Sequence, residues 1–450
     1  MLKHKINLTG LFIAITVFIV LLFLPVFDSQ KAQYAFALLA MVAILWITES
    51  IPLPLTSLLI PVGAIFLQLL SPKDAFTEFA NPILFLFMGG FVLAGALSYH
   101  SLDKMLAQKL IKLAGGNFYR SAIFLMLSTA LTAFFVSNTS STAMMIPLAL
   151  GMLVLVDKDT VSPESKFLML GIAYSANIGG IVTIISSPPN AIGAAILNIN
   201  FLTWLKYSVP IFLITFPVMI TVLTLYFKPD RKMSIGVMTF EKETAAPLKT
   251  LIFIFLLTVI LWMMDGILSP LLHIDNSFNS LVAIFAIFLI YITKVLSWDK
   301  ILKSINWEIL LLFGGGLTLG FIIEESGLGE ILIGKISSLI TLVPIYVFLL
   351  AIVIFSIILT EFMSNTASAA MMLPLLFSLA TQLEINPVLL LLPATIAASF
   401  GFMMPAGTPP NAMVFSSGYV PQKDMLKAGL IVNVLVALIV TTYFYFIFYH

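Results

Sequence analysis

Two stretches of this chain carry nearly the same fourteen residues: SNTSSTAMMIPLAL at positions 137–150 and SNTASAAMMLPLLF at positions 364–377. Nine of the fourteen positions are identical, and the copies lie 227 residues apart. Pro-Pro-Asn occurs at 188–190 and again at 409–411, and a glycine-containing segment occurs at 87–90 and 313–316, at spacings of 221 and 226. Three ordered motifs at almost one spacing indicate that the chain consists of two related halves.

The composition places the chain in a membrane. Of its 450 residues, 60% are hydrophobic and 10% charged, and the mean hydropathy is +1.11. Soluble proteins are near half apolar and a quarter charged, so an ordinary soluble enzyme or a disordered chain is excluded. With 22 basic and 21 acidic residues, no basic stripe remains for nucleic acid. The chain has no cysteine and only four scattered histidines, which leaves no usual metal centre.

The apolar runs predict an all-α polytopic membrane protein. The first run, 8–26, follows Lys3 and Lys5 and has no cleavage site after it, so we expect a retained span rather than a signal peptide. Its 19 residues suffice to cross a hydrocarbon core of about 30 Å. The further runs are 34–47, 53–70, 83–99, 121–156, 167–198, 207–227, 251–264, 281–293, 309–323, 343–379, 387–415 and 428–448.

Four of these runs are interrupted. Runs 121–156 and 343–379 are too long for one span and are broken by Ser-Asn-Thr, while the run after each is broken by Pro-Pro-Asn. Broken helices occur at membrane depth only where protein or a water-filled cavity satisfies the freed backbone groups. If each Ser-Asn-Thr segment is a re-entrant hairpin, the chain has eleven transmembrane helices and two hairpins, with 228–249 linking the halves.

The basic residues predict the orientation. With the N-terminus in the cytoplasm, 18 of the 22 Lys and Arg are cytoplasmic, and the four outside are Lys31, Lys73, Lys206 and Lys335. The C-terminus is then outside. The first hairpin opens to the cytoplasm and the second to the outside, although charge counting does not distinguish a hairpin from two full crossings. An inverted repeat with matching interruptions is a common plan of secondary transporters.

The Ser-Asn-Thr segments have the chemistry of an anion site. Ser, Asn and Thr cap helix N-termini, where free N–H groups and the positive end of the helix dipole attract anions without Lys or Arg. Two such ends from inverted halves could hold a small dianion, one carboxylate at each end. A single copy would be only a tight turn, but two near-identical copies favour the functional interpretation.

Two further features have alternative interpretations. Proline at each Pro-Pro-Asn break frees upstream carbonyls, which with hydroxyls and Asn oxygens could form a cage for an alkali cation. Glu361 is an intramembrane acid and so a candidate proton or cation site. We favour a structural role for it, hydrogen-bonded to nearby backbone donors, because a free carboxylate would repel a dianion and Phe134 stands at the matching place. The 314–316 glycines favour close helix packing.

The paired motifs, together with WITESIP at 46–52, resemble the divalent anion:sodium symporter family, the INDY-like dicarboxylate transporters, over nearly the whole chain. The resemblance implies a bacterial member in the cytoplasmic membrane that works as a homodimer by an elevator mechanism. The scaffold domain would comprise 1–118 and 228–342, and the transport domain 119–227 and 343–450. The substrate would be a C4 or C5 dicarboxylate such as succinate, malate, fumarate or 2-oxoglutarate.

The resemblance also implies the site residues. Those expected to bind substrate are Asn138, Thr139, Ser187, Pro188, Asn365, Thr366 and Pro409. Sodium, the one candidate coupling ion, would bind in the first half at Ser137, Asn138 and Ser186. In the second half it would bind at Thr360, Ser364, Asn365 and Gly407. No other cofactor is implied.

Two departures leave the coupling mode open. Family symporters usually have a hydroxyl where this chain has Ala133, and a small glycine-like residue where it has Ser186. The first sodium site is therefore in doubt, and sodium-independent exchange of one dicarboxylate for another is slightly favoured over sodium symport. Citrate, tartrate or sulfate are alternative substrates.

Two other function classes fit less well. An anion channel would need a continuous polar stripe or a ring of charges. An intramembrane enzyme would need a nucleophile with a base, or an acid pair, at one depth. Isolated polar breaks, and Glu361 without a second acid, match neither class, so the chain is predicted not to be an enzyme.

Overall fold

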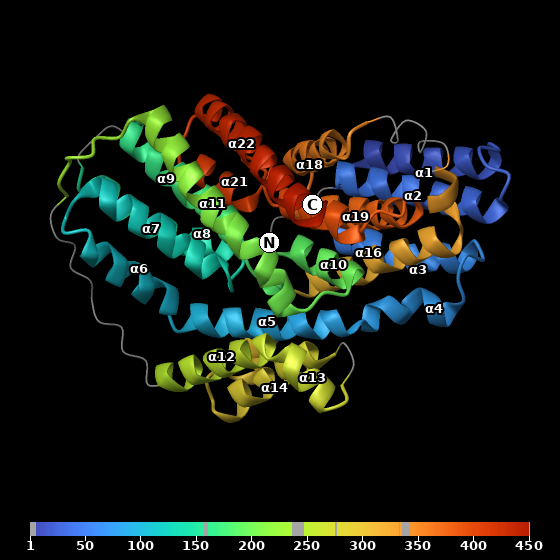
Figure 1. The fold of residues 1–450 in the computed structure, drawn as a ribbon, viewed down its shortest axis with the longest axis horizontal. Helices are drawn as coiled ribbons and strands as arrows, with labels where there is room; N and C mark the ends of the chain where they lie inside the picture. Colours follow the sequence, from blue (N-terminus) through green and yellow to red (C-terminus); the bar gives the residue numbers. More distant parts are fainter. Residues whose placement is uncertain are drawn as a thin grey trace.

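The computed structural model describes residues 6–156, 161–235, 247–274, 277–332, 334 and 343–449. Within these ranges the chain is helical, and the only extended pairing is an isolated bridge between Asn117 and Ser234. Figure 1 shows an elongated molecule in which many helices run along its long axis.

The first half contains eleven α-helices among the described residues. They are α1 (Leu8–Phe23), α2 (Gln30–Thr48), α3 (Leu53–Phe66), α4 (Pro72–Thr77), α5 (Pro82–Tyr99), α6 (Leu102–Leu113), α7 (Phe118–Ala133), α8 (Asn138–Val154), α9 (Pro163–Gly179), α10 (Pro188–Leu197) and α11 (Phe201–Phe227). Two 3-10 turns, η1 (Glu78–Ala80) and η2 (Ile184–Ser186), precede α5 and α10. Several helices begin where an Asn or Ser side chain accepts a backbone N–H of the first turn, as Ser29, Asn117 and Asn200 do.

The second half follows the same order. Its described helices are α12 (Leu248–Met263), α13 (Asp265–Leu271), α14 (Phe278–Ile292), α15 (Trp298–Ser304), α16 (Trp307–Glu325), α18 (Ile345–Phe362), α19 (Asn365–Gln382), α20 (Pro387–Ala397), α21 (Pro409–Ser416) and α22 (Gln422–Phe448). The final helices of the halves, α11 and α22, are each 27 residues long and pack against each other.

Six described spans are long and apolar enough to cross a membrane, and the bent pair α12–α13 makes a seventh if it is one span. They are α2, the α4–α5 segment, α11, α16, α18 and α22. Six shorter apolar helices of 10–17 residues, among them α7, α8 and α20, accompany them. The all-α polytopic class expected from the sequence is confirmed, whereas the count of eleven crossings stays a prediction.

Glycines reveal the repeat in the packing of α5 and α16. A Cβ on Gly89 of α5 would overlap Ala283 of α14, and a Cβ on Gly315 of α16 would overlap Ser57 of α3. Gly315 and Ala283 lie 226 residues after Gly89 and Ser57. The same close contact is therefore made twice with the halves exchanged, and the predicted packing role of these glycines is confirmed.

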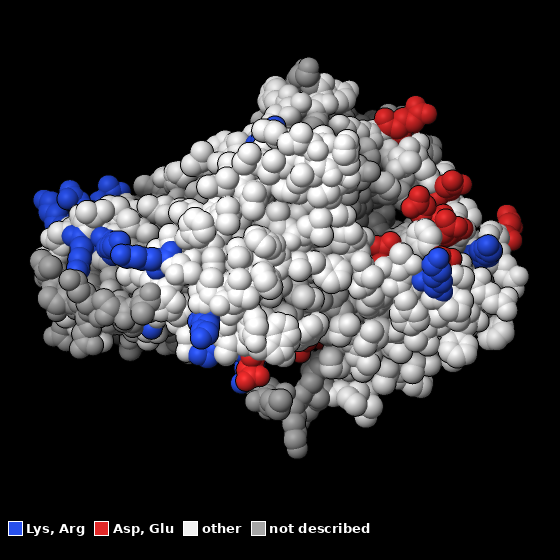
Figure 2. Space-filling model, turned by 90° about the horizontal axis from the view of Figure 1, so that it is seen from below, with Lys and Arg blue, Asp and Glu red and all other residues white. Residues whose placement is uncertain are grey.

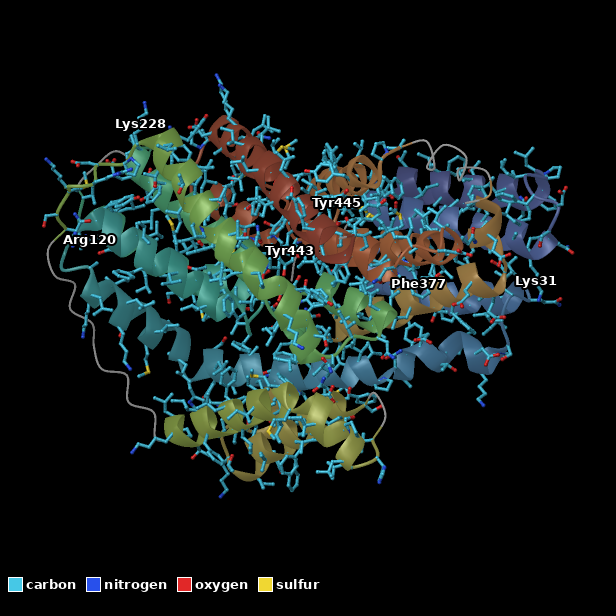
Figure 3. All side chains as sticks on the ribbon, viewed as in Figure 1. Lys31, Arg120, Lys228, Phe377, Tyr443 and Tyr445 are labelled. Carbon is cyan, nitrogen blue, oxygen red and sulfur yellow. The ribbon has the colours of Figure 1, made fainter. Side chains whose placement is uncertain are left out.

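Charged side chains separate toward the two ends of the molecule. Figure 2 shows most of the visible Lys and Arg at one end, and mainly acidic residues at the other. Arg120 and Lys228 lie at the first end and Lys31 at the opposite end (Figure 3). The expected topology assigns Arg120 and Lys228 to one side of the membrane and Lys31 to the other, which is consistent with these positions, and the orientation stays a prediction.

Candidate functional site

The first Ser-Asn-Thr segment forms the tip of a helical hairpin made of α7 and α8. Ser137 is the N-cap of α8, and its Oγ accepts the N–H of Ser140 at 3.3 Å. Ser137 and Thr139 are exposed, and Asn138 is partly buried. The segment therefore begins a helix at an accessible position, as its sequence predicts.

The first Pro-Pro-Asn break separates α9 from α10. The Asn190 Nδ2 group donates to the carbonyls of Gly180 and Thr183, at 2.8 Å each. The Ser186 Oγ lies 2.7 Å from the same two carbonyl oxygens. The Asn190 Oδ1 atom is buried and has no hydrogen-bond partner among the described residues, so the expectation that this oxygen meets a cation stays a prediction.

The remaining carbonyls of this break are also hydrogen-bonded. The indole Nε1 of Trp204 donates to Ile181 O at 3.0 Å, and Ser208 Oγ donates to Val182 O at 2.6 Å. All four carbonyls from 180 to 183 thus have side-chain donors, which makes a helix break tolerable in a protein interior.

The second break, between α20 and α21, repeats the main feature of the first. The Asn411 Nδ2 group donates to the carbonyls of Gly401 at 2.8 Å and Met404 at 3.0 Å. These three residues lie 221 positions after Asn190, Gly180 and Thr183. Gly407 stands at the position that corresponds to Ser186, so the second break lacks that hydroxyl.

The second Ser-Asn-Thr segment, between α18 and α19, differs from the first in its hydrogen bonds. Ser364 precedes α19 but makes no side-chain cap bond. Thr360 Oγ1 lies 2.7 Å from Asn365 Oδ1 and 2.7 Å from Ala398 O. A hydroxyl has one proton to donate, so three oxygens converge here around a single proton. Such a group suits a hard cation.

Glu361 is buried and anchors the second break to its hairpin. Its Oε1 accepts from the backbone N–H of Met403 at 2.8 Å and from Asn433 Nδ2 at 2.9 Å. Its Oε2 accepts from Met404 N–H at 2.9 Å. The favoured structural role is confirmed. A Cβ on Gly407 would lie 2.8 Å from Oε2, so the carboxylate also lies directly beside the Gly407 backbone of the second break.

Asn177 is a site residue that the sequence reasoning missed. It is fully buried on α9, and its Nδ2 donates to Thr408 Oγ1 at 3.0 Å, across the boundary between the halves. Asn138 Nδ2 lies 3.5 Å from Asn177 Oδ1. Asn177 thereby connects the first Ser-Asn-Thr segment with the second break. An amide within an apolar run, just before Gly179 and Gly180, was the available signal.

The remaining predicted residues lie at the starts of helices α10, α19 and α21. Ser187 is buried before α10, which begins at Pro188, and Pro409 is exposed at the start of α21. Thr366 is buried in the first turn of α19. Helix α8 packs on α21, and α19 packs on α10, so the second arm of each hairpin meets the helix that follows the other half's break.

Two cavities flank α10. One, of about 370 Å³, reaches Ile184 of the first break and is lined by Asn81, Asn279 and Asp265. The other, of about 560 Å³, lies between α16 and α19. Neither is lined by a Ser-Asn-Thr residue.

Comparison with known proteins identifies the family. The profile described as citrate transporter matches residues 43–390 and again 362–450. The chain belongs to this transporter family. An uncharacterised transporter of Haemophilus influenzae is 41% identical over 98% of this chain and 96% of its own length. The sodium-dependent dicarboxylate transporter SdcS of Staphylococcus saprophyticus is 33% identical over 98% of this chain and 91% of its own length.

A solved structure shares the fold. The YdaH transporter of Alcanivorax borkumensis aligns with a TM-score of 0.58 at 14% identity, covering 92% of this chain and 96% of that one. The expected relationship to divalent-anion transporters is confirmed, and the protein is a multi-pass membrane transporter rather than an enzyme.

Proposed function

We propose that this transporter carries C4 and C5 dicarboxylates of the succinate, malate, fumarate and 2-oxoglutarate class. The observation that carries the proposal is the pair of Ser-Asn-Thr helix starts, one from each inverted half, that offer anion sites without a basic side chain. The name of the 33% identical relative, a sodium-dependent dicarboxylate transporter, supports the same class.

The proposed substrate residues lie at the starts of α8, α10, α19 and α21. Asn138, Thr139, Asn365 and Thr366 would meet the two carboxylates, and Ser187, Pro188 and Pro409 would line the pocket. The exposure of Thr139 and Pro409 supports access from water. In a neutral pocket, binding rests on helix N-termini and amide donors.

We further propose an elevator mechanism, with scaffold 1–118 and 228–342, transport domain 119–227 and 343–450, and a homodimer held by the scaffold. One asymmetry supports it. Ala370 and Pro374 of α19 are buried against Gly316 and Gly320 of α16. The corresponding residues of α8, Ala143 and Pro147, are exposed. One hairpin is thus docked on the scaffold while the matching face of the other is open.

The orientation follows from the same proposal. With the N-terminus in the cytoplasm and the C-terminus outside, α8 belongs to the hairpin that opens to the cytoplasm. Its exposed face then leads from the cytoplasm to Ser137 and Thr139, so the structure corresponds to a state open to the inside of a bacterial cytoplasmic membrane.

For the coupling mode, we slightly favour exchange of one dicarboxylate for another over sodium symport. Ala133 offers no hydroxyl at the first half's cation position, and Ser186 fills the space that a glycine would leave. If sodium is coupled, the oxygens of Thr360, Asn365 and Ala398 form the better-suited group.

The deciding experiment is uptake of labelled succinate into liposomes that contain the purified protein. Four conditions are needed: an inward sodium gradient or none, each with and without unlabelled dicarboxylate inside. Exchange predicts uptake that requires internal dicarboxylate and ignores sodium. Symport predicts sodium-dependent uptake into empty vesicles. If succinate is not taken up in any of the four conditions, the dicarboxylate assignment is contradicted.

Another dianion is the second candidate. The matching family profile is described as citrate transporter, so citrate has a specific observation in its favour. Unlabelled citrate, tartrate and sulfate, added in excess outside the liposomes, distinguish these substrates. The compound that most strongly suppresses succinate uptake, and is itself taken up, is the preferred substrate.

A further inference from the structure

The cavity of about 370 Å³ lies where the start of α11 meets α5, α13 and α14. Its lining includes residues from the N-terminal ends of α5, α11 and α14, together with Asp265 at the start of α13. Asp265 is 9% exposed, and none of the described residues that line the cavity is basic. A buried carboxylate needs positive charge nearby. Three helix N-termini provide it here, because each carries about half a positive elementary charge.

The start of α11 makes two neighbouring contacts with the α12–α13 segment. The Asn200 Oδ1 atom caps α11 by accepting the N–H of Thr203 at 2.9 Å, and the Asn200 side chain also hydrogen-bonds to the Asp265 carboxylate. The next residue, Phe201, packs on Trp262 with ring centroids 5.1 Å apart, and both rings are fully buried. We call Asn200, Phe201, Trp262 and Asp265 the α11 docking point.

One side of the docking point is held together by hydrogen bonds between helices. The indole Nε1 of Trp262 donates to the carbonyl of Asn279 at 2.9 Å, which joins α12 to α14. Ser280 Oγ donates to the carbonyl of Pro82 at 2.6 Å, which joins α14 to α5. Trp262 and Asp265 are therefore fixed to a connected group of helices that includes α5 and α14.

The other side of the docking point is connected to the first Pro-Pro-Asn break. Trp204 and Ser208 lie about one and two turns after Phe201 on α11. These are the residues whose side chains donate to the carbonyls of Ile181 and Val182 in the break. The first two turns of α11 thus join the break to the docking point, and the break cannot move far from α12 and α13 while the docking point is closed.

We propose that Asp265 is a positioning residue for transport, which holds the start of α11, and through it the first break, in the state described here. The inference rests on the proposed elevator mechanism, in which α11 belongs to the transport domain and α12–α14 belong to the scaffold. Movement of the transport domain must then separate Asn200 from Asp265. The contact therefore stabilises one end state of the transport cycle relative to the other.

Cross-linking of the paired cysteines in Gly316→Cys/Ala370→Cys reports the population of this state. The two Cβ atoms would lie 3.0 Å apart, on helices α16 and α19, which are not part of the docking point. In this background we expect Asp265→Asn, which removes the charge and keeps the shape, to slow cross-linking about 3-fold or more. Asn200→Ser keeps an oxygen that can cap α11 but loses the amide, so it should slow cross-linking in the same direction.

Two further variants separate the contact from a general effect of charge. Asp265→Glu keeps the carboxylate and should restore much of the cross-linking rate. Asp299→Asn is the matched control, because Asp299 also lies in the first turn of a seven-residue helix, α15, but is exposed. We expect its cross-linking rate to equal that of the background. Variants are used only if they elute as a single species in gel filtration.

The double variant Asp265→Asn/Asn200→Ser tests whether the two residues act through one contact. We expect it to cross-link no more slowly than the slower single variant, since both changes remove the same interaction. Effects that multiply in the double variant would mean that Asp265 acts only on its own helix, and would overturn the proposal. Unchanged cross-linking in both single variants would overturn it as well.

The measurement also keeps this proposal separate from the proposed function. Cross-linking is followed without substrate, whereas succinate uptake is measured separately in liposomes. Slower cross-linking in the variants, with no succinate uptake by wild type, would contradict the substrate class alone. Succinate uptake by wild type, with unchanged cross-linking in the variants, would contradict the role of Asp265 alone. A cross-link that leaves uptake unimpaired would contradict the elevator mechanism and this proposal with it.

Discussion

Asn190 and Asn411 make the same pair of hydrogen bonds in the two halves of the protein. Each side-chain nitrogen donates to the carbonyls ten and seven residues before it, at 2.8 and 2.8 Å in the first half and at 2.8 and 3.0 Å in the second. The asparagine of each Pro-Pro-Asn motif thus supplies hydrogen-bond donors in place of those that the helix loses at the break. We call this asparagine the clamp of the break. Both side chains are fully buried.

Loss of either clamp should destabilise the fold. Asn190→Ala and Asn411→Ala each leave two carbonyls without that donor, at a cost of about 2–4 kcal/mol. Thermal unfolding in detergent measures the effect. Asn386→Ala is the matched control, because Asn386 only caps α20 at an exposed position, a contribution of about 1 kcal/mol. Equal losses in Asn411→Ala and Asn386→Ala would refute the clamp.

The Ser-Asn-Thr amides should carry substrate affinity. Asn138→Ala and Asn365→Ala each remove an amide placed to meet a carboxylate, and we expect affinity to fall at least 10-fold, from a loss of about 1.5–3 kcal/mol. Direct binding of labelled succinate to the purified protein measures this. Asn7→Ala, which removes the N-cap of α1, should leave affinity unchanged. Wild-type affinity in both site variants would place the substrate elsewhere.

Glu361 should matter mainly for stability. Glu361→Ala leaves the N–H groups of Met403 and Met404 and the Asn433 amide without their acceptor, and we expect a loss of at least about 3 kcal/mol. Unfolding curves of the variant and of wild type give the difference. Glu308→Ala is the control, an exposed acid in the first turn of α16, for which we expect less than about 1 kcal/mol. A normal melting temperature with abolished transport would instead indicate a direct coupling role.

Cysteine pairs can test the docking of the hairpins, because the natural chain has no cysteine. A Cβ on Gly316 would lie 3.0 Å from that of Ala370, close to disulfide range. We expect Gly316→Cys/Ala370→Cys to cross-link in the state described here and to block transport reversibly. Gly90 and Ala143 occupy the same places in the first half as Gly316 and Ala370 in the second. We therefore expect Gly90→Cys/Ala143→Cys to cross-link in the opposite state of the transport cycle.

The two cysteine pairs should respond oppositely to conditions that shift the transport cycle. A condition that raises cross-linking of one pair should lower that of the other, as measured by gel mobility before and after reduction. Each single-cysteine variant serves as the control. If both pairs formed together in the same molecules, the two hairpins would dock at once and the elevator proposal would fail.

Much of the architecture was predictable because its signals are local. The Ser-Asn-Thr and Pro-Pro-Asn motifs interrupt apolar runs, and helix starts and breaks depend on residues within a few positions of each other. The role of Glu361 was also predictable, since a buried acid without a basic neighbour needs backbone donors, and Met403 and Met404 supply them. The repeat itself was visible in the spacings.

What the sequence alone determined is therefore the repeat, the helical membrane class and the identity of the four breaks. The tertiary structure decided how the first Ser-Asn-Thr segment is connected to the second Pro-Pro-Asn break, because Asn177 and Thr408 are 231 residues apart and their bond forms only once the halves pack. It also decided that Ala143 is exposed and Ala370 buried, although both occupy the same place in one repeated motif. The repeated sequence is nearly symmetric, but the packing is not, because one copy of the motif is buried against α16 while the other is exposed.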